Sequence, residues 1–161
     1  REGKCVRFNE QDARPIGRTS AGVRGISIQE HDQVVGMICA DTSVEAALLP
    51  HVLVVSENGY GKRSLIEDYR KVARGGKGVK TLNITEKTGK LIAIKAVNNE
   101  NDLMIITRSG VTIRVAVSDI RLLGRATQGV KLINLREGDA IAAVCCVPKS
   151  DPLPKEEGDD L

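Results

Sequence analysis

Short runs of hydrophobic residues, separated by turns, make up most of the chain. Some runs are continuously apolar, as at 52–55 and 103–106, and others alternate between apolar and polar positions, as at 112–117 and 129–135. Alternation is typical of a half-buried β-strand, and a short continuous run is consistent with a strand buried on both faces. No long stretch has helical periodicity, although Thr42–Leu49 could form one or two helical turns. The pattern therefore predicts an all-β fold.

A pair of glycines recurs three times with the same spacing. The first glycine closes a turn and the second stands nineteen residues later, followed by valine, a basic residue and a short alternating strand. The three pairs are Gly3 and Gly22, Gly59 and Gly78, and Gly110 and Gly129. The unit recurs after 56 and then after 51 residues, and self-similarity of this kind is the signature of a repeat architecture such as a propeller.

Each complete unit is predicted to form four antiparallel strands. A complete unit begins with an apolar strand, continues with two alternating strands and ends with a closing apolar strand. The closing strands are expected at 34–39, 91–97 and 140–147. Four strands in about 50 residues are typical of a propeller blade. The expected fold is an all-β, propeller-like array over residues 1–147, with units at about 1–40, 51–97 and 103–147.

The first unit lacks a leading apolar strand, so the chain is expected to carry two and a half to three blades. Because closed propellers need at least about four blades, we expect these units to belong to a longer domain. The alternative is a self-contained β-sandwich of about eleven strands, which would leave the regular spacing of the repeat without a structural reason.

The composition is that of a globular protein, with 24 basic and 21 acidic side chains, 41% hydrophobic residues and 2% aromatic ones. No apolar run approaches the ~18–20 residues of a membrane span, and the first residues do not resemble a signal peptide. The four cysteines show no CxxC spacing, which is typical of a chain kept in a reducing compartment. We therefore expect a cytoplasmic protein with no membrane partner.

Basic residues occupy the same four positions in all three units. Arginine is seldom buried without a partner, so we expect a basic stripe along one edge of the array. These positions follow the first glycine by 4, 11, 15 and 21 residues and are filled by Arg7, Arg63 and Arg114; Arg14, Arg70 and Arg121; Arg18, Arg74 and Arg125; and Arg24, Lys80 and Lys131.

A basic stripe of this kind suits the evenly spaced phosphates of double-stranded DNA. The scarcity of aromatic side chains and the absence of Trp disfavour single-strand binding, which relies on base stacking. The sequence also predicts no recognition helix that could read bases in a groove. We therefore expect duplex binding without sequence specificity. The alternatives are solvated rim charges or a protein-interaction propeller with an acidic partner, and the latter predicts a shallow dependence of DNA binding on salt.

The segment from Arg74 to Gly78 combines two bases with three glycines, Gly75, Gly76 and Gly78. Glycine allows backbone N–H groups to approach an anion closely, while Arg74 and Lys77 supply positive charge, so the loop is a candidate phosphate site. It is not a nucleotide-binding P-loop, because no Gly-Lys pair in the chain is followed by Ser or Thr. A flexible hairpin loop is the simpler alternative.

The charge reverses at the end of the chain. Residues 149–161 hold two bases and five acids, a net charge of −3, whereas residues 1–148 carry a net charge of +6. Residues 148–161 are predicted to form a disordered, Pro-containing acidic tail that either frays freely or competes with a polyanion for the basic surface. If it competes, deleting residues 149–161 is expected to tighten duplex binding in an equilibrium titration. Unchanged affinity would remove the competing role.

No catalytic, metal or cofactor site is evident in the sequence. His31 and His51 have no evident Cys or Ser partner, and Tyr60 is expected at a hairpin tip. Cys145 and Cys146 are neighbours on a predicted strand and point to opposite faces, so they are not placed to bind one metal ion together. An enzyme with its site in a blade-lined channel would need a cluster of carboxylates or histidines, which the sequence does not offer.

Three stretches, GRTSAGVRGISI, NGYGKRSLIEDYRKVARGGKGVKTLNI and SGVTIRVAVSDIRLLGRATQGVKLINL, resemble the C-terminal domain of the DNA gyrase A subunit. The related domain of the topoisomerase IV A subunit is the alternative. The resemblance implies part of a six-bladed β-pinwheel, a propeller variant whose neighbouring blades exchange strands. It also implies that duplex DNA wraps around the basic rim. The other parts of the gyrase A and B subunits, with ATP and Mg²⁺, would act elsewhere in a bacterial, nucleoid-associated enzyme that introduces negative supercoils.

The hallmark of this family is the seven-residue box Gln-Arg-Arg-Gly-Gly-Lys-Gly. Residues 72–78 match the box from Arg74 to Gly78, but Val72 and Ala73 replace Gln and the first Arg. The resemblance therefore implies a partial copy of the DNA-binding box in the second unit.

Overall fold

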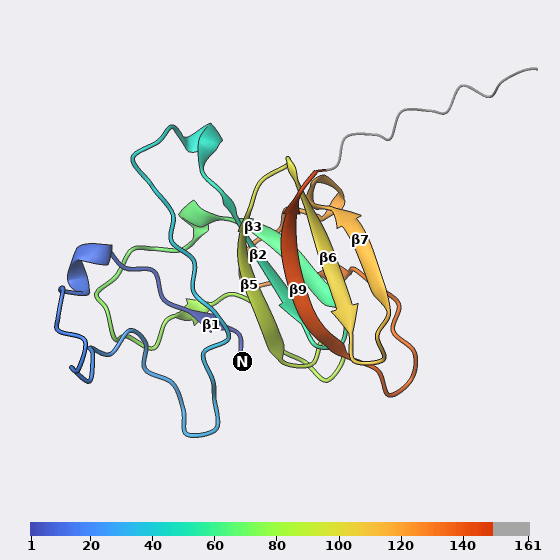
Figure 1. Ribbon diagram of the computed structural model, residues 1–161, viewed down its shortest axis with the longest axis horizontal. Coiled ribbons are helices and arrows are strands. Elements are labelled where there is room, and N and C mark those ends of the chain that lie inside the picture. The colour runs from blue at the N-terminus through green and yellow to red at the C-terminus, as the bar shows by residue number, and fades with distance from the viewer. Residues whose placement is uncertain (150–161) are drawn as a thin grey trace, which may run out of the picture.

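A computed structural model describes residues 1–149 and shows an all-β fold, which confirms the predicted class (Figure 1). The predicted tail lies outside these residues, apart from Pro148 and Lys149. None of the helices in the described range is long and apolar enough to cross a membrane. The strands are β1 (Lys4–Cys5), β2 (His51–Ser56), β3 (Tyr60–Leu65), β4 (Val79–Lys80), β5 (Leu91–Val97), β6 (Asn101–Thr107), β7 (Thr112–Ala116), β8 (Val130–Lys131) and β9 (Ile141–Pro148).

Short 3-10 helices punctuate the units at matching positions. Three of them, η1 (Glu10–Asp12), η3 (Ile66–Asp68) and η4 (Val117–Asp119), are 56 and 51 residues apart, so they preserve the spacing of the glycine repeat. The fourth, η2 (Ala46–Leu48), lies within Thr42–Leu49, where the sequence predicts a helical turn.

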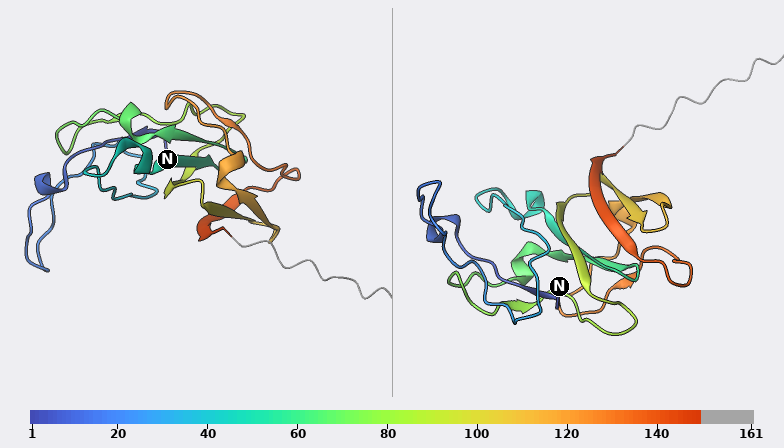
Figure 2. Two further views of the ribbon diagram at one scale, coloured as in Figure 1. Left: turned by 90° about the horizontal axis from the view of Figure 1, so that it is seen from above. Right: turned by 60° about the horizontal axis from the view of Figure 1, so that its bottom comes forward.

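Neighbouring units exchange strands. The four-stranded sheet has the order β5-β2-β3-β8, and its last strand comes from the third unit. Likewise, β4 of the second unit pairs with β1 of the first, while β7-β6-β9 form the third sheet. The third strand of the second and of the third unit therefore crosses to the preceding unit, as the exchange of strands implied by the family resemblance requires. Figures 1 and 2 show the resulting array, with the units following one another along the molecule.

The continuous apolar run of β2 is buried on both faces. Leu53 and Val55 pack with Leu103, Ile105 and other residues of the third unit. Their neighbours Val52 and Val54 belong to a second core, with Ile66, Tyr69 and Leu82, against which side chains of the first unit pack. Successive residues of a strand point to opposite faces, so an uninterrupted run of Val and Leu is what a sheet between two others requires.

The first unit forms less regular structure than the sequence predicts. The closing strands β5 and β9 pair with the leading strands β2 and β6, but the first unit has no leading strand in this chain. The predicted strand at 34–39 consequently has no regular strand structure: Val35 and Ile38 pack against the second core, while Val34 and Met37 are exposed. The predicted strand at 129–135 is also shortened, to β8.

Two of the repeated glycines are required by close packing between units. Gly59 has φ +88° and Gly129 has φ +79°, and both values lie in the left-handed region that favours glycine. A Cβ on Gly129 would lie 2.6 Å from the carbonyl oxygen of Gly61, and one on Gly59 would lie 2.9 Å from that of Ile133. The glycine repeat therefore marks both a turn and the place where an exchanged segment crosses its acceptor.

Candidate nucleic-acid interface

Two eleven-residue stretches carry the exchanged strands, and we call them the exchange segments: residues 70–80 and 121–131. Segment 70–80 lies along the first unit, where Lys80 is paired with Lys4 and Lys71 with Arg7. Segment 121–131 lies along β3, where Lys131 is paired with Tyr60 and Leu122 with Arg63. Each segment thus covers the edge strand of the preceding unit, and three of the four repeated basic positions fall on it.

The exchange segments and their first-unit counterpart, residues 14–24, contain only basic charges. Together these 33 residues hold eleven Arg and Lys and no Asp or Glu. The other 128 residues hold the remaining 13 bases and all 21 acids, so their net charge is −8. Positive charge is therefore concentrated on these segments, which is the distribution expected of a surface that binds a polyanion.

The first arginine position serves the contact between units. Arg7 donates from its Nη1 to the carbonyl oxygens of Ile66 and Tyr69, at 3.0 Å each. Arg63 donates from Nε to the carbonyl oxygen of Ile120 at 2.7 Å and from Nη2 to that of Ser118 at 3.3 Å. Each arginine thus binds the 3-10 turn of the following unit.

The expectation of a surface position does not hold for Arg63, whose relative exposure is 7%. Its Nη1 also donates to Oδ1 of Asn99 at 2.6 Å and lies 3.3 Å from Nδ1 of His51. Burial and the charge of Arg63 lower the pKa of His51, which keeps the imidazole neutral beside the guanidinium. Backbone carbonyls, rather than repeated carboxylates, satisfy the buried arginine, and the sequence does not reveal them.

Arg114 holds the same repeat position in the third unit but remains exposed. Its Nε donates to Oδ2 of Asp102 at 2.7 Å, and its Nη2 donates to the carbonyl oxygen of Pro148 at 2.9 Å. Asp102 stands where His51 stands in the second unit, so the cross-strand contact is kept although the partner differs.

The third basic position points back to the preceding unit. Arg74 donates from Nε to the carbonyl oxygen of Asp12 at 3.0 Å and from Nη1 to that of Arg24 at 2.5 Å. Arg125 makes the matching bonds to the carbonyl oxygens of Asp68 and Lys80, both at 3.0 Å. Both side chains bind neutral carbonyls, so their positive charge adds to the surface potential, whereas their counterpart Arg18 is exposed.

The second and fourth basic positions are exposed in every unit. None of their side chains takes part in a salt bridge within the described range 1–149. Lys80 donates to Oδ1 of Asn83 at 3.2 Å, and the Lys131 ammonium lies 5.9 Å from the centre of the Tyr60 ring. With Lys77, these exposed cations form the set Arg14, Arg24, Arg70, Lys77, Lys80, Arg121 and Lys131, which we call the exposed basic set.

The glycine-rich loop at 74–78 is ordered by backbone hydrogen bonds to the first unit. The N–H of Gly75 donates to the carbonyl oxygen of Gly25 at 2.8 Å, and the N–H of Ser27 donates to that of Gly76 at 2.9 Å. Gly75 and Gly78 have positive φ, and a Cβ on Gly78 would lie 2.5 Å from the carbonyl oxygen of Cys5. The loop is therefore a shaped element that leaves the Lys77 side chain exposed.

Lys62 is a charged residue of this region that the repeat does not reveal. It is fully buried in β3, and its Nζ donates to the carbonyl oxygens of Gly124 and Arg125, at 2.6 and 2.5 Å, and to Oγ1 of Thr127 at 3.1 Å. Burial lowers the pKa of its ammonium group to about 8. Val6 and Ile113 stand at the matching positions of the other units, so no repeated pattern points to it.

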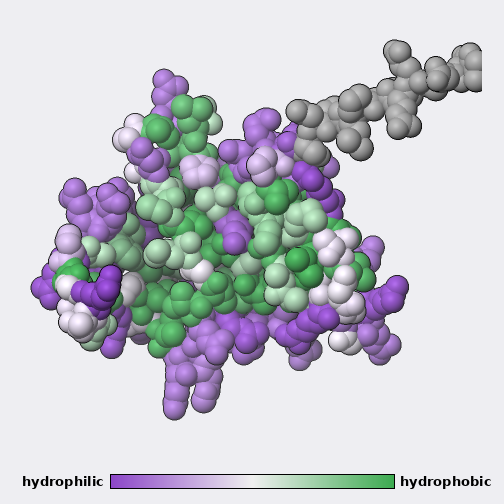
Figure 3. Space-filling model, in the orientation of Figure 1, coloured by the Kyte–Doolittle hydropathy of each residue, from purple (hydrophilic) through white to green (hydrophobic). Residues whose placement is uncertain are grey.

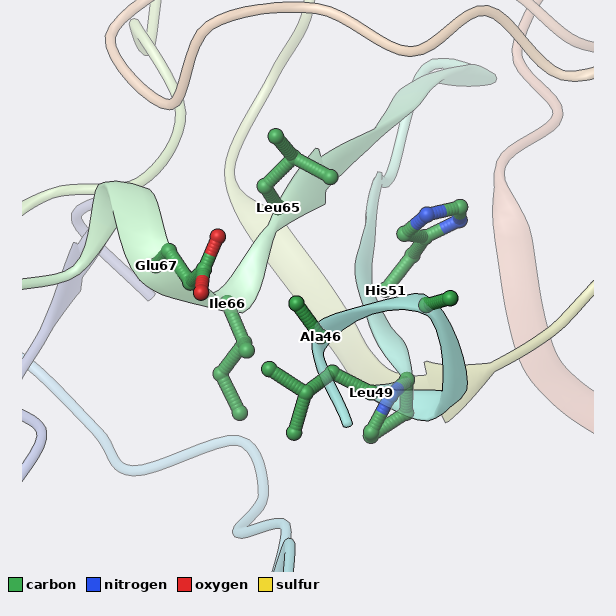
Figure 4. Close-up of a pocket in the computed structure, with 8 residues that line it drawn as sticks. Ala46, Leu49, His51, Leu65, Ile66 and Glu67 are labelled. Carbon is green, nitrogen blue, oxygen red and sulfur yellow. The ribbon is translucent and has the colours of Figure 1, made fainter. Parts of the chain in front are cut away.

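A shallow hollow beside η2 is the place where a small-molecule site could be sought (Figure 4). Aliphatic side chains such as Leu49, Leu65 and Ile66 line most of it, with His51 and Glu67 on opposite sides. These two groups make no hydrogen bond with each other, and none of the residues that line the hollow is arranged for acid–base or nucleophilic chemistry. In Figure 3 the visible face is hydrophobic over its middle and hydrophilic along its margins.

Comparison with known proteins matches this architecture. The family model described as the DNA gyrase C-terminal domain, a β-propeller, matches residues 1–41, 50–98 and 101–147. The DNA gyrase A subunit of Staphylococcus epidermidis is 49% identical over 146 residues, and that of Staphylococcus aureus is 47% identical over 155 residues. These alignments cover 91% and 96% of the chain but only 16% of each relative, so the chain spans about a sixth of their length.

Two solved structures share the fold. A DNA gyrase A C-terminal domain superposes with a TM-score of 0.72 at 23% identity, over 89% of this chain and 47% of that one. The C-terminal domain of a DNA topoisomerase IV superposes with a TM-score of 0.79 at 21% identity, over 91% and 44%. The family model matches all three units, and the gyrase A subunits are 47–49% identical to the chain. The chain therefore belongs to the family of DNA gyrase A C-terminal domains.

Proposed function

We propose that this chain binds duplex DNA through its exchange segments, without reading sequence. The observation that carries the proposal is the separation of charge, with eleven bases and no acid on residues 14–24, 70–80 and 121–131. Arg and Lys neutralise phosphates and release counterions, and this interaction is independent of the bases. Contacts spread over three successive units would hold a bent duplex, since bending 20–30 bp by 40–90° costs on the order of 1–6 kcal/mol.

The wider role follows from the family. As part of a gyrase A subunit in the bacterial cytoplasm, this array would hold DNA wrapped beside the other domains of the gyrase A and B subunits. That wrap would support the ATP-driven introduction of negative supercoils. The chain itself would contribute DNA binding, and the catalytic groups would lie elsewhere in the enzyme.

The direct test is the binding of this chain to a fluorescent duplex of about 40 bp, titrated with salt. If six or seven cations of the exposed basic set contact phosphates, log K is expected to fall with log salt at a slope of about −5 to −6. A single strand of equal length should bind more weakly, because the surface offers few aromatic side chains for stacking. A flat salt dependence, or equal binding of both ligands, would contradict the proposal.

A further inference from the structure

The two exchange segments share one backbone bond to the preceding unit and differ in the rest of the anchoring of their loops. In segment 70–80, glycines allow the backbone at 75–76 to bond directly to Gly25 and Ser27 of the preceding unit. In segment 121–131, Ala126 and Thr127 stand where the first segment has Gly75 and Gly76. The carbonyl oxygen of Thr127 accepts from the N–H of Asn83 at 3.0 Å, as that of Gly76 accepts from Ser27, but the bond that Gly75 makes has no counterpart in segment 121–131. This second loop is bonded in addition by the Lys62 ammonium, which reaches it from β3.

The position of Lys62 accounts for the direction in which the loop faces. A buried ammonium must be hydrogen-bonded, and here it draws the carbonyl oxygens of Gly124 and Arg125 inward. Ser64, two residues further along the same strand, adds a bond from its hydroxyl to the carbonyl oxygen of Leu123 at 2.7 Å. Lys62 thus holds the middle of the loop against β3, between the backbone bond of Arg121 with Arg63 and the β8–β3 pairing of Lys131, and both of these flanking side chains are exposed.

We propose that Lys62 is a positioning residue for DNA binding: it holds residues 121–131 in the conformation that presents their cations, without contacting DNA itself. This inference rests on the proposed function. It predicts that a fully buried side chain influences the affinity for a polyanion, and that its effect is confined to one of the two exchange segments.

The first test is hydrogen exchange of the Lys62→Met variant, which keeps an unbranched side chain but removes the donor. Backbone amides of residues 121–131 should exchange at least tenfold faster than in the wild-type chain, while those of 70–80 should be unchanged. Equal protection of 121–131 in both proteins would overturn the inference. This measurement needs no DNA, so it is independent of whether the proposed function holds.

The second test compares duplex affinity with that of Lys90→Met, which removes one exposed cation outside the exchange segments. Lys62→Met should weaken binding about tenfold or more and make the salt slope shallower by about 1–2, because Arg121 and Lys131 lose their fixed positions. An effect no larger than that of Lys90→Met would overturn the positioning role. Failure of the wild-type chain to bind would instead overturn the proposed function.

A pH series separates positioning from simple packing. Lys62 loses its proton with a pKa of about 8, and an amine has one donor fewer than an ammonium for three acceptors. The affinity ratio of wild type to Lys62→Met should therefore shrink between pH 7 and 9. The charged groups that face it are Arg125 and Asp68, and the pKa values of Tyr69 and Cys5 in the adjoining core are raised by burial. A constant ratio would contradict the role of the ammonium.

Discussion

Replacing Arg63 with methionine is expected to lower the free energy of unfolding by about 3 kcal/mol. The variant keeps much of the aliphatic packing but leaves the buried carbonyl oxygen of Ile120, the carbonyl oxygen of Ser118 and Oδ1 of Asn99 without their donor. Hydrogen bonds from a charged group contribute roughly 1.5–3 kcal/mol each, and a stranded buried acceptor costs a similar amount. Chemical denaturation, followed by circular dichroism, would measure the loss.

Arg114→Met is the matched control, because Arg114 occupies the same repeat position in the third unit. Its side chain is 42% exposed and its pair with Asp102 is reached by solvent, so the expected loss is about 1 kcal/mol or less. If both variants lose the same free energy of unfolding, the bonds of Arg63 to the next unit stabilise the fold no more than the exposed ion pair of Arg114 does. A further comparison of duplex affinity should show little direct effect of Arg63→Met at temperatures where the variant is folded.

The double variant Arg70→Gln, Arg121→Gln is expected to bind duplex DNA about 50-fold more weakly at 0.1 M salt. Both side chains are exposed at the start of their exchange segments, and each phosphate contact contributes roughly 0.9 to the salt slope. The slope should therefore become shallower by about 2. Stability should change by less than about 0.5 kcal/mol, as is usual for exposed positions.

The matched control removes two other exposed arginines, Arg108 and Arg136, which lie in turns of the third unit. Arg108 follows β6, whereas Arg121 comes after the opposite end of the paired strand β7, so the two arginines lie at different ends of the hairpin. The control variant has the same net charge as the test variant and should retain the wild-type salt slope. If both double variants lose the same affinity, net charge rather than the exchange segments determines binding.

These two experiments separate roles that the sequence presents as one. Arg63 and Arg70 both belong to repeated basic positions, seven residues apart, and nothing in the pattern of side chains distinguishes them. In the folded chain the first is buried against the next unit and the second is exposed. The distinction depends on backbone carbonyls, which every residue carries and which therefore leave no mark in the sequence.

The all-β class, the turns and the periodic placement of bases can be predicted from the sequence without a structure. Each of these follows from local rules: alternation for strands, positive φ for the turn glycines, and the reluctance of arginine to be buried without partners. The same rules could not place the third strand of each unit, because β4 and β8 are only two residues long and pair across the boundary between units.

Contacts between units determine which cations are exposed, how each loop is anchored and where the closing strand can form. Lys62 is buried only because segment 121–131 crosses β3. Its hydrogen-bond partner Thr127 is 65 residues away along the chain. The segment at 34–39 is not a strand because residues 1–149 contain no leading strand of its unit with which it could pair, whatever its own propensity. Local pattern specifies what each segment can form, and contacts between units more than 50 residues apart select which of those possibilities is stable.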